Sequence, residues 1–124
     1  MLWLTACAPQ IITEPPVAGI LPVADNVQLP EVIKSLISQS DKLYLNNDYV
    51  GAVSTLERAV RINPRYAEVW SRMAQVYLTQ GNLEQAKQHA KRSNSVVKDN
   101  SKLREFNNKI ISGGSGEIQK DVLH

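Results

Sequence analysis

The sequence is poor in the residues on which enzymes and metal sites most often depend. Its 124 residues include one cysteine, Cys7, and two histidines, His89 and His124, which lie far apart. A single cysteine excludes an internal disulfide, and no Cys/His pair has the spacing of a metal site. The Gly/Ser run at 112–116 follows no strand signal, so it does not indicate a phosphate-binding loop. We therefore expect a non-enzymatic protein without a cofactor, in which His89 is an ordinary exposed side chain among lysines.

Strand signals, long apolar runs and an excess of one charge are also missing. No β-branched segment alternates for long with polar residues, as a strand would. The apolar runs are confined to the start of the chain and stay below the roughly 18 residues of a membrane-spanning helix. Fourteen Lys and Arg residues against 12 Asp and Glu residues give a formal net charge of +2. So small a charge argues against a nucleic-acid partner, which usually meets a concentrated basic face.

What the chain does contain is an internal repeat with a period of 34 residues. Matching residues at this spacing are Ala52 and Ala86, Leu56 and Ala90, Ala59 and Ser93, Leu36 and Trp70, Leu43 and Tyr77, Tyr49 and Leu83, and Asn47 and Gly81. A fixed period of this length is typical of stacked helical hairpins, which bury their apolar faces against each other. We therefore predict two repeats, over 33–66 and 67–100.

The helices of the first hairpin are predicted from the residues that interrupt them. Pro30 can open a helix because the first turn does not need its missing N–H, and apolar residues recur at helical spacing over 32–45. The polar run 46–48 breaks this pattern, and Asp48 is a good cap for the next helix. That helix should end before Pro64, because the residue preceding a proline disfavours helical geometry.

The second hairpin and a final helix follow from signals of the same kind. We expect Pro64 to start the third helix with Asn63 as its cap, and Gly81 to supply the left-handed residue that ends it. Asn82 begins a pattern that resembles a capping box for the fourth helix. Apolar residues at helical spacing predict a fifth helix over about 101–111, which would cover the last apolar face of the stack.

The second repeat also carries a recognisable pattern of large and small residues. It reads Trp-x2-Met-Ala-x2-Tyr-x3-Gly-x4-Ala from Trp70 to Ala86, and a proline ends the helix before it. This pattern resembles the tetratricopeptide repeat (TPR). The resemblance covers 33–100 and implies an all-α fold: two TPR-type antiparallel helix hairpins plus a C-terminal capping helix (an α-α superhelix), with an extended N-terminal tail. Leu36, in place of the usual aromatic, and Lys98, in place of the usual proline, are departures that end units often show.

The chain is accordingly divided into three parts. Residues 1–29 are expected to be a lipobox-like start and a Pro-rich tether, and residues 30–111 the TPR domain. Residues 112–124, which begin with the Gly/Ser run, are expected to be a flexible tail.

The lone cysteine lies in a short motif of its own. Leu4-Thr5-Ala6-Cys7 resembles the lipobox of bacterial lipoproteins, which implies a lipid anchor on Cys7. The residue after the cysteine is Ala8, and the resemblance then implies an outer-membrane lipoprotein that faces the periplasm. A signal peptide, however, needs a basic start and an apolar stretch of about 7–15 residues, more than precedes Cys7 here. Either a longer precursor exists, or the match is chance and Cys7 is an incidental thiol.

The family resemblance also implies where a partner would bind. In TPR proteins the first helix of each hairpin lines a concave groove that takes a peptide or a partner helix. The matching outward positions are Lys34, Ile37, Asp41, Tyr44 and Leu45 in the first unit, and Glu68, Ser71, Gln75, Leu78 and Thr79 in the second. The alternatives are that some of them pack on the N-terminal segment or on a second copy of the chain, since two repeats are fewer than the three or so that stability usually needs.

A basic run forms a second candidate surface. It consists of Lys87, Lys91, Arg92, Lys98, Lys102 and Arg104. These residues could meet anionic lipid headgroups or an acidic partner, but the acidic residues among them favour an ordinary solvated helix face.

Two functions are consistent with these observations. The first is a protein-interaction module, a lipid-anchored adaptor or assembly factor of the bacterial envelope. The alternative is a cytoplasmic TPR protein with regulatory or chaperone-like binding and no lipid.

Overall fold

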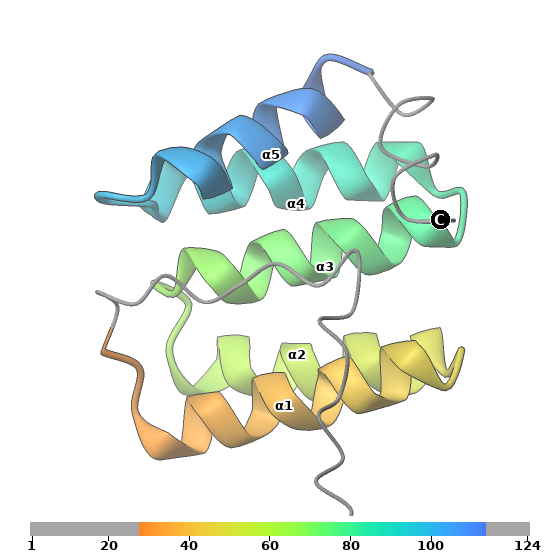
Figure 1. Ribbon diagram of the computed structural model, residues 1–124, viewed down its shortest axis with the longest axis vertical. Helices are drawn as coiled ribbons and strands as arrows, with labels where there is room; N and C mark the ends of the chain where they lie inside the picture. Colours follow the sequence, from red (N-terminus) through yellow and green to blue (C-terminus); the bar gives the residue numbers. More distant parts are fainter. Residues whose placement is uncertain (1–27, 114–124) are drawn as a thin grey trace, which may run out of the picture.

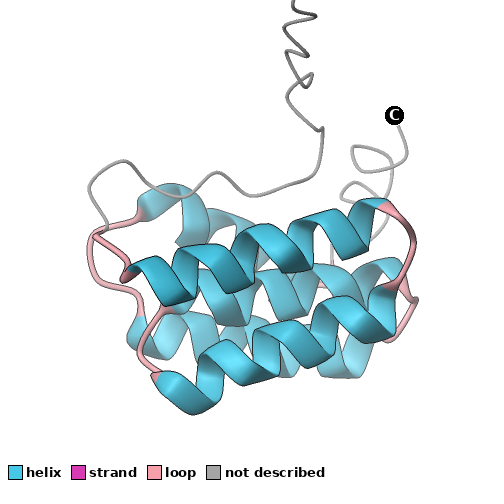
Figure 2. Cartoon of the chain, turned by 90° about the horizontal axis from the view of Figure 1, so that it is seen from below, coloured by secondary structure: helices cyan, strands magenta, loops and turns pink. Residues whose placement is uncertain are grey.

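The computed structural model describes residues 28–113, and this part of the chain folds into five helices. They are α1 (Glu31–Leu45), α2 (Tyr49–Ile62), α3 (Ala67–Thr79), α4 (Leu83–Val96) and α5 (Ser101–Ile111). The helices form a stack in which α1 and α2 lie at one end and α4 and α5 at the other, with α3 between them (Figure 1). Short loops join consecutive helices at the helix ends, on two opposite sides of the stack (Figure 2). The predicted all-α fold is confirmed, and residues 28–113 contain no strand.

The turns inside the two hairpins have the same geometry, 34 residues apart. Asn47 (φ 62°) and Gly81 (φ 78°) both adopt the left-handed conformation, which Gly and Asn tolerate better than other residues. The same two backbone bonds close each turn: Asn47 N to Tyr44 O (3.0 Å) with Asp48 N to Leu43 O (2.9 Å), and Gly81 N to Leu78 O (3.0 Å) with Asn82 N to Tyr77 O (2.9 Å). The repeat seen in the sequence is therefore a repeat of backbone conformation.

The predicted caps at Asp48 and Asn82 are confirmed, and Asn100 caps α5 in the same way. The side-chain oxygens accept hydrogen bonds from backbone N–H groups in the first turn: Asp48 from Gly51 (2.9 Å), Asn82 from Gln85 (3.3 Å) and Asn100 from Leu103 (3.0 Å). Each bond satisfies a donor that the helix itself cannot pair.

The predicted start of the third helix is wrong. The helix begins at Ala67 rather than Pro64, and its N-cap residue, Tyr66, makes no side-chain cap. Asn63 instead accepts a hydrogen bond from the Arg65 N–H (3.0 Å), and Trp70 Nε1 donates to the Pro64 carbonyl (2.8 Å). These two bonds hold the segment before α3 as a turn.

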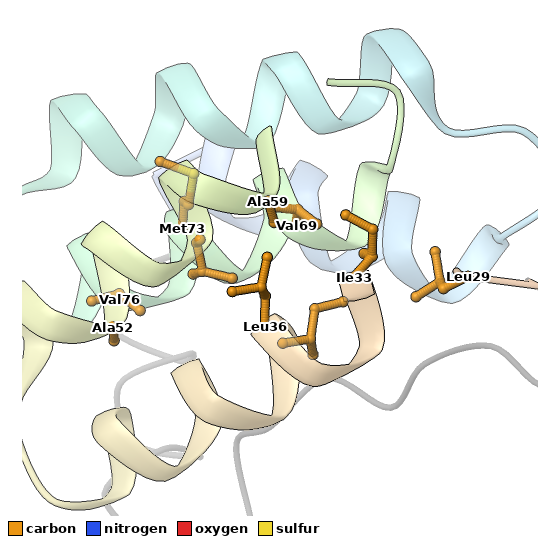
Figure 3. Close-up of a cluster of buried hydrophobic side chains, with 10 residues drawn as sticks. Leu29, Ile33, Leu36, Ala52, Ala59, Val69, Met73 and Val76 are labelled. Atoms are coloured by element: carbon orange, nitrogen blue, oxygen red, sulfur yellow. The ribbon is translucent and has the colours of Figure 1, made fainter. Parts of the chain in front are cut away.

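The interior is divided into two hydrophobic clusters. The first joins α1, α2 and α3, and its fully buried members include Ile33, Leu56 and Val69. Figure 3 shows Ile33 and Val69 among the side chains of this cluster. The second, smaller cluster joins α3, α4 and α5 around Ala86 and Ile110. Each large aliphatic side chain buried in this way contributes about 1.5–3 kcal/mol relative to an exposed one.

Helix α5 continues the repeat and closes the stack. In α3, Val69, Met73 and Val76 belong to the cluster that faces the preceding hairpin. The residues 34 positions further on are Leu103, Asn107 and Ile110, and all three are buried. Helix α5 therefore occupies the place of the first helix of a third unit, as the predicted capping helix should.

At the opposite end of the stack, the corresponding positions on α1 are polar. The residues 34 positions before Val69, Met73 and Val76 are Ser35, Gln39 and Lys42 on α1, and all three are exposed. A further helical unit would need apolar residues there to pack against.

Candidate partner-binding surface

Helices α1, α3 and α5, the first helix of each successive unit, are joined by side-chain hydrogen bonds, α1 to α3 and α3 to α5. The three pairs are Arg72 Nε with Asp41 Oδ1 (3.0 Å), Tyr44 Oη with Thr79 Oγ1 (2.8 Å), and Ser71 Oγ with Asn107 Oδ1 (2.8 Å). We call the surface made by these three helices the groove wall. Its polar contacts hold the helices in one fixed arrangement.

The ion pair between Asp41 and Arg72 joins a buried guanidinium group to a partly exposed carboxylate. The Arg72 side chain is 4% exposed and the Asp41 side chain 24%. A second guanidinium nitrogen, Nη2, lies 3.4 Å from Asp41 Oδ2, so the contact approaches the two-pronged geometry that makes Arg–carboxylate pairs specific. It fixes the rotation of α3 against α1.

Tyr44 belongs to a short hydrogen-bond chain. Thr79 Oγ1 donates its single proton to the Gln75 carbonyl (3.0 Å), so in the 2.8 Å contact between the two hydroxyl groups Tyr44 is the donor. The Tyr44 ring packs edge-on against Tyr49, with 5.6 Å between the centroids. Burial raises the pKa of the Tyr44 hydroxyl above its ordinary value, because the tyrosinate would lose its hydration.

Asn107 is the centre of a buried polar network beneath α5. Its amide oxygen accepts from Ser71 Oγ (2.8 Å), and its amide nitrogen donates to Ser93 Oγ (2.8 Å) and Asn94 Oδ1 (2.9 Å). Ser93 Oγ in turn donates to the Ala67 carbonyl (2.8 Å). Because every polar group of Asn107 has a partner, the network specifies one position of α5 at little cost.

The ten sequence-predicted groove residues differ widely in exposure. Lys34 and Leu45 are exposed, and Asp41, Tyr44 and Thr79 are half-buried. The others are buried: Ile37, Glu68, Ser71, Gln75 and Leu78. The accessible part of the predicted groove is therefore its α1 side.

The buried members were expected to face outward, and the packing explains the difference. Ile37 belongs to the first hydrophobic cluster, and Leu78 belongs to the second, where it packs with Ile110 of α5. Ser71 is fully buried and bonded to Asn107. These side chains lie on the predicted helices, but their spacing in the sequence does not show which other helices cover them.

Gln75 and Glu68 are buried polar residues of another kind. In the part of the chain that the structure describes, the Gln75 Nε2 atom has no hydrogen-bond partner. The Glu68 side chain, only 4% exposed, lines a cavity at the start of α3. Buried polar groups usually have partners, so Gln75 is the least satisfied of the ten.

His89 is not the ordinary exposed side chain that the sequence suggested. It is half-buried between α3 and α4, with ring centroids 5.0 Å from Tyr77 and 5.8 Å from Trp70. Its Nδ1 atom lies 2.8 Å from the Gln85 carbonyl, and the Arg92 guanidinium lies 5.5 Å from the centre of the Trp70 ring. The seven-residue spacing of Trp70 and Tyr77, which puts both on one face of a helix, was the signal for this cluster.

Other kinds of site find no support between residues 28 and 113. No group of His, Cys, Asp and Glu side chains in that range could hold a metal ion. None of the five described helices is long and apolar enough to cross a membrane. The basic run is exposed apart from Lys87, which is half-buried. Cys7 lies outside the described residues.

Comparisons with known proteins agree with this geometry. A tetratricopeptide repeat family model matches residues 43–105. Among solved structures, the globular C-terminal domain of LpoP from P. aeruginosa matches with a TM-score of 0.66 and 33% sequence identity, over 76% of this chain and 88% of that one. A search of the curated proteins gave no match.

Proposed function

Because the chain belongs to the tetratricopeptide repeat family, whose helical hairpins are scaffolds for protein interaction, we propose that it is a non-enzymatic adaptor. It binds a peptide or a helix of another protein along the groove wall. A lipid on Cys7 holds it at the bacterial outer membrane, facing the periplasm.

The observation that carries the binding function is the pre-formed groove wall. Three side-chain contacts hold α1, α3 and α5 together before any partner arrives. A surface that is already ordered loses less conformational freedom on binding than one that must assemble. Lys34 and Leu45 are exposed along α1, and they offer a charge and an apolar contact to the partner.

The lipid anchor has its own supporting observations. The lipobox-like residues 4–7 are followed by a Pro-rich stretch, which suits a semi-rigid spacer between a membrane and a folded domain. The matching domain of LpoP is described as the globular C-terminal part of that protein. Here too the helical domain follows an N-terminal segment.

Site-specific photo-crosslinking in the native cell tests the groove. A photoreactive phenylalanine analogue at Lys34 or Leu45 should capture a discrete partner, while the same analogue at Arg58, exposed on α2, should not. Identical products from all three positions, or none from α1, would refute the groove assignment.

Mass spectrometry of the mature protein tests the anchor. We expect a diacylglyceryl adduct on Cys7 and a membrane fraction that loses the protein on Cys7→Ser substitution. An unmodified Cys7 in a soluble fraction would favour the cytoplasmic alternative and leave the groove experiment unaffected.

A further inference from the structure

A cavity of about 720 Å³ lies on one side of the stack, where α2 and α4 end and α3 and α5 begin. It is bounded by the loop that joins α2 to α3 and by the loop that joins α4 to α5. We call it the junction pocket. Its polar side chains are those of Asn63, Arg65, Tyr66, Glu68, Ser95, Lys98, Asp99 and Asn100. Its volume falls within the range of cavities that bind small ligands or the side chains of a partner.

Glu68 is the unusual member of the junction pocket. Its side chain is 4% exposed, yet within residues 28–113 its carboxyl group takes part in no hydrogen bond and no ion pair. Acidic side chains are rarely buried without a partner. The pocket is therefore lined by a carboxyl group of a largely buried residue, and the described residues supply it with no donor.

Glu68 shares the pocket with the C-terminal end of α4, and both favour a positively charged group there. Helix α4 ends at Val96, and Ser95, Val96 and Val97 line the cavity. The end of a helix carries partial negative charge. The C-terminal end of α4 and the side chain of Glu68 thus line the same pocket.

The exposed charged residues of the pocket are two basic residues, Arg65 and Lys98, and one acidic residue, Asp99. Among the described residues, neither Arg65 nor Lys98 forms an ion pair with Glu68. Exposed basic groups at the rim suit an acidic residue of a bound chain. The pocket therefore fits a segment in which a basic residue has an acidic neighbour.

We propose that the junction pocket receives a Lys or Arg side chain of the protein partner, with Glu68 as the acceptor and Arg65 and Lys98 in contact with an adjacent acidic residue. This inference rests on the proposed function, since it requires a protein partner, and it specifies the partner's chemistry. Glu68 is then the residue that determines specificity.

Selection from a random dodecapeptide phage library against the full chain tests this proposal. Peptides recovered on the wild type and on Glu57→Gln, which changes an exposed acid on α2, should be enriched in a basic residue beside an acidic one. The Glu68→Gln variant should bind those peptides about tenfold more weakly. Equal binding by Glu68→Gln, or selected peptides without a basic residue, would overturn the proposal. Circular dichroism melts of all three proteins establish that each is folded.

Chemical-shift mapping separates this inference from the groove function. A selected peptide should shift the amide signals of residues 67–68 and 95–100, and its citrulline or norleucine analogue should not. Shifts confined to α1 would refute the junction pocket and leave the groove intact. Shifts at the pocket, together with no crosslink from Lys34 or Leu45, would refute the groove and retain the pocket.

Discussion

The guanidinium group of Arg72 donates to the carboxylate of Asp41 across the contact between α3 and α1, with 3.0 Å between Nε and Oδ1. These two helices are separated in the chain by the whole of α2. Because the Arg72 side chain is 4% exposed, water and salt screen the pair less than a surface pair. The contact thus links the first helices of successive repeats by charge as well as by packing.

Loss of the Asp41 carboxylate should destabilise the domain. We expect Asp41→Asn to lower the free energy of unfolding by about 1–3 kcal/mol, the usual effect of removing a hydrogen bond to a buried charged group. Chemical denaturation measures this change. The matched control is Glu31→Gln, which removes the exposed partner of Lys34 on α1 and should leave the unfolding midpoint unchanged. Equal midpoints for the wild type and Asp41→Asn would contradict the role given to the pair.

Asn107 should be more sensitive than its small polar side chain suggests. Replacing it with leucine removes the acceptor of the Ser71 hydroxyl group and both donor contacts to α4. We expect a loss of about 1–3 kcal/mol of stability, since a buried hydroxyl group is left unpaired. Thermal unfolding and amide hydrogen exchange of α5 measure the effect.

A double variant distinguishes the hydrogen-bond network from simple packing. If the Ser71 hydroxyl is the group left unpaired, Ser71→Ala should recover part of the stability lost in Asn107→Leu, so that the two changes are not additive. Strictly additive losses would show that the bond between Ser71 and Asn107 contributes nothing specific.

Much of the fold could be predicted because it depends on local chemistry repeated at a fixed distance. Asn47 and Gly81 match in the sequence, and both supply the left-handed residue of a hairpin turn. Asp48 and Asn82 match as well, and both cap a helix. Such signals depend on a few neighbouring residues, so the sequence alone reveals them.

The exposure of the candidate site could not be predicted in the same way, because it depends on distant elements. Ser71 is polar and lies on the expected face of α3, yet the partner that buries it, Asn107, is 36 residues away. The register did contain a clue, since Asn107 lies 34 residues after the buried Met73. The start of α3 was missed for a local reason: Asn63 can cap a helix or a turn, and here it accepts from Arg65.

Ala86 is a small residue on α4 that packs in the second hydrophobic cluster. It is fully buried in the cluster that also contains Ala74, Leu78 and Ile110. Ala86→Leu should overpack this cluster and lower the stability by about 1–3 kcal/mol, as measured by a thermal melt. The same substitution at Gln88, exposed on the same helix, should have no such effect. An unchanged melt of Ala86→Leu would contradict the packing of α4 on α3.

Tyr44 should make the stability of the domain depend on pH in the alkaline range. Burial raises the pKa of its hydroxyl in the folded state above the ordinary value of 10.0, so the unfolded chain releases this proton first. As the pH rises above about 10, the unfolded state therefore holds fewer protons than the folded state, and stability falls until the folded-state pKa is passed. Below the ordinary value the contribution of Tyr44 is constant.

The Tyr44→Phe variant isolates this effect from the lysines that titrate in the same range. Urea unfolding of both proteins at a series of pH values should give a stability difference that is constant at neutral pH and shifts in favour of the variant above pH 10. The difference exists because phenylalanine has no proton to lose. Parallel stability curves over the whole alkaline range would show that the Tyr44 hydroxyl ionises as readily in the folded protein as in the unfolded chain.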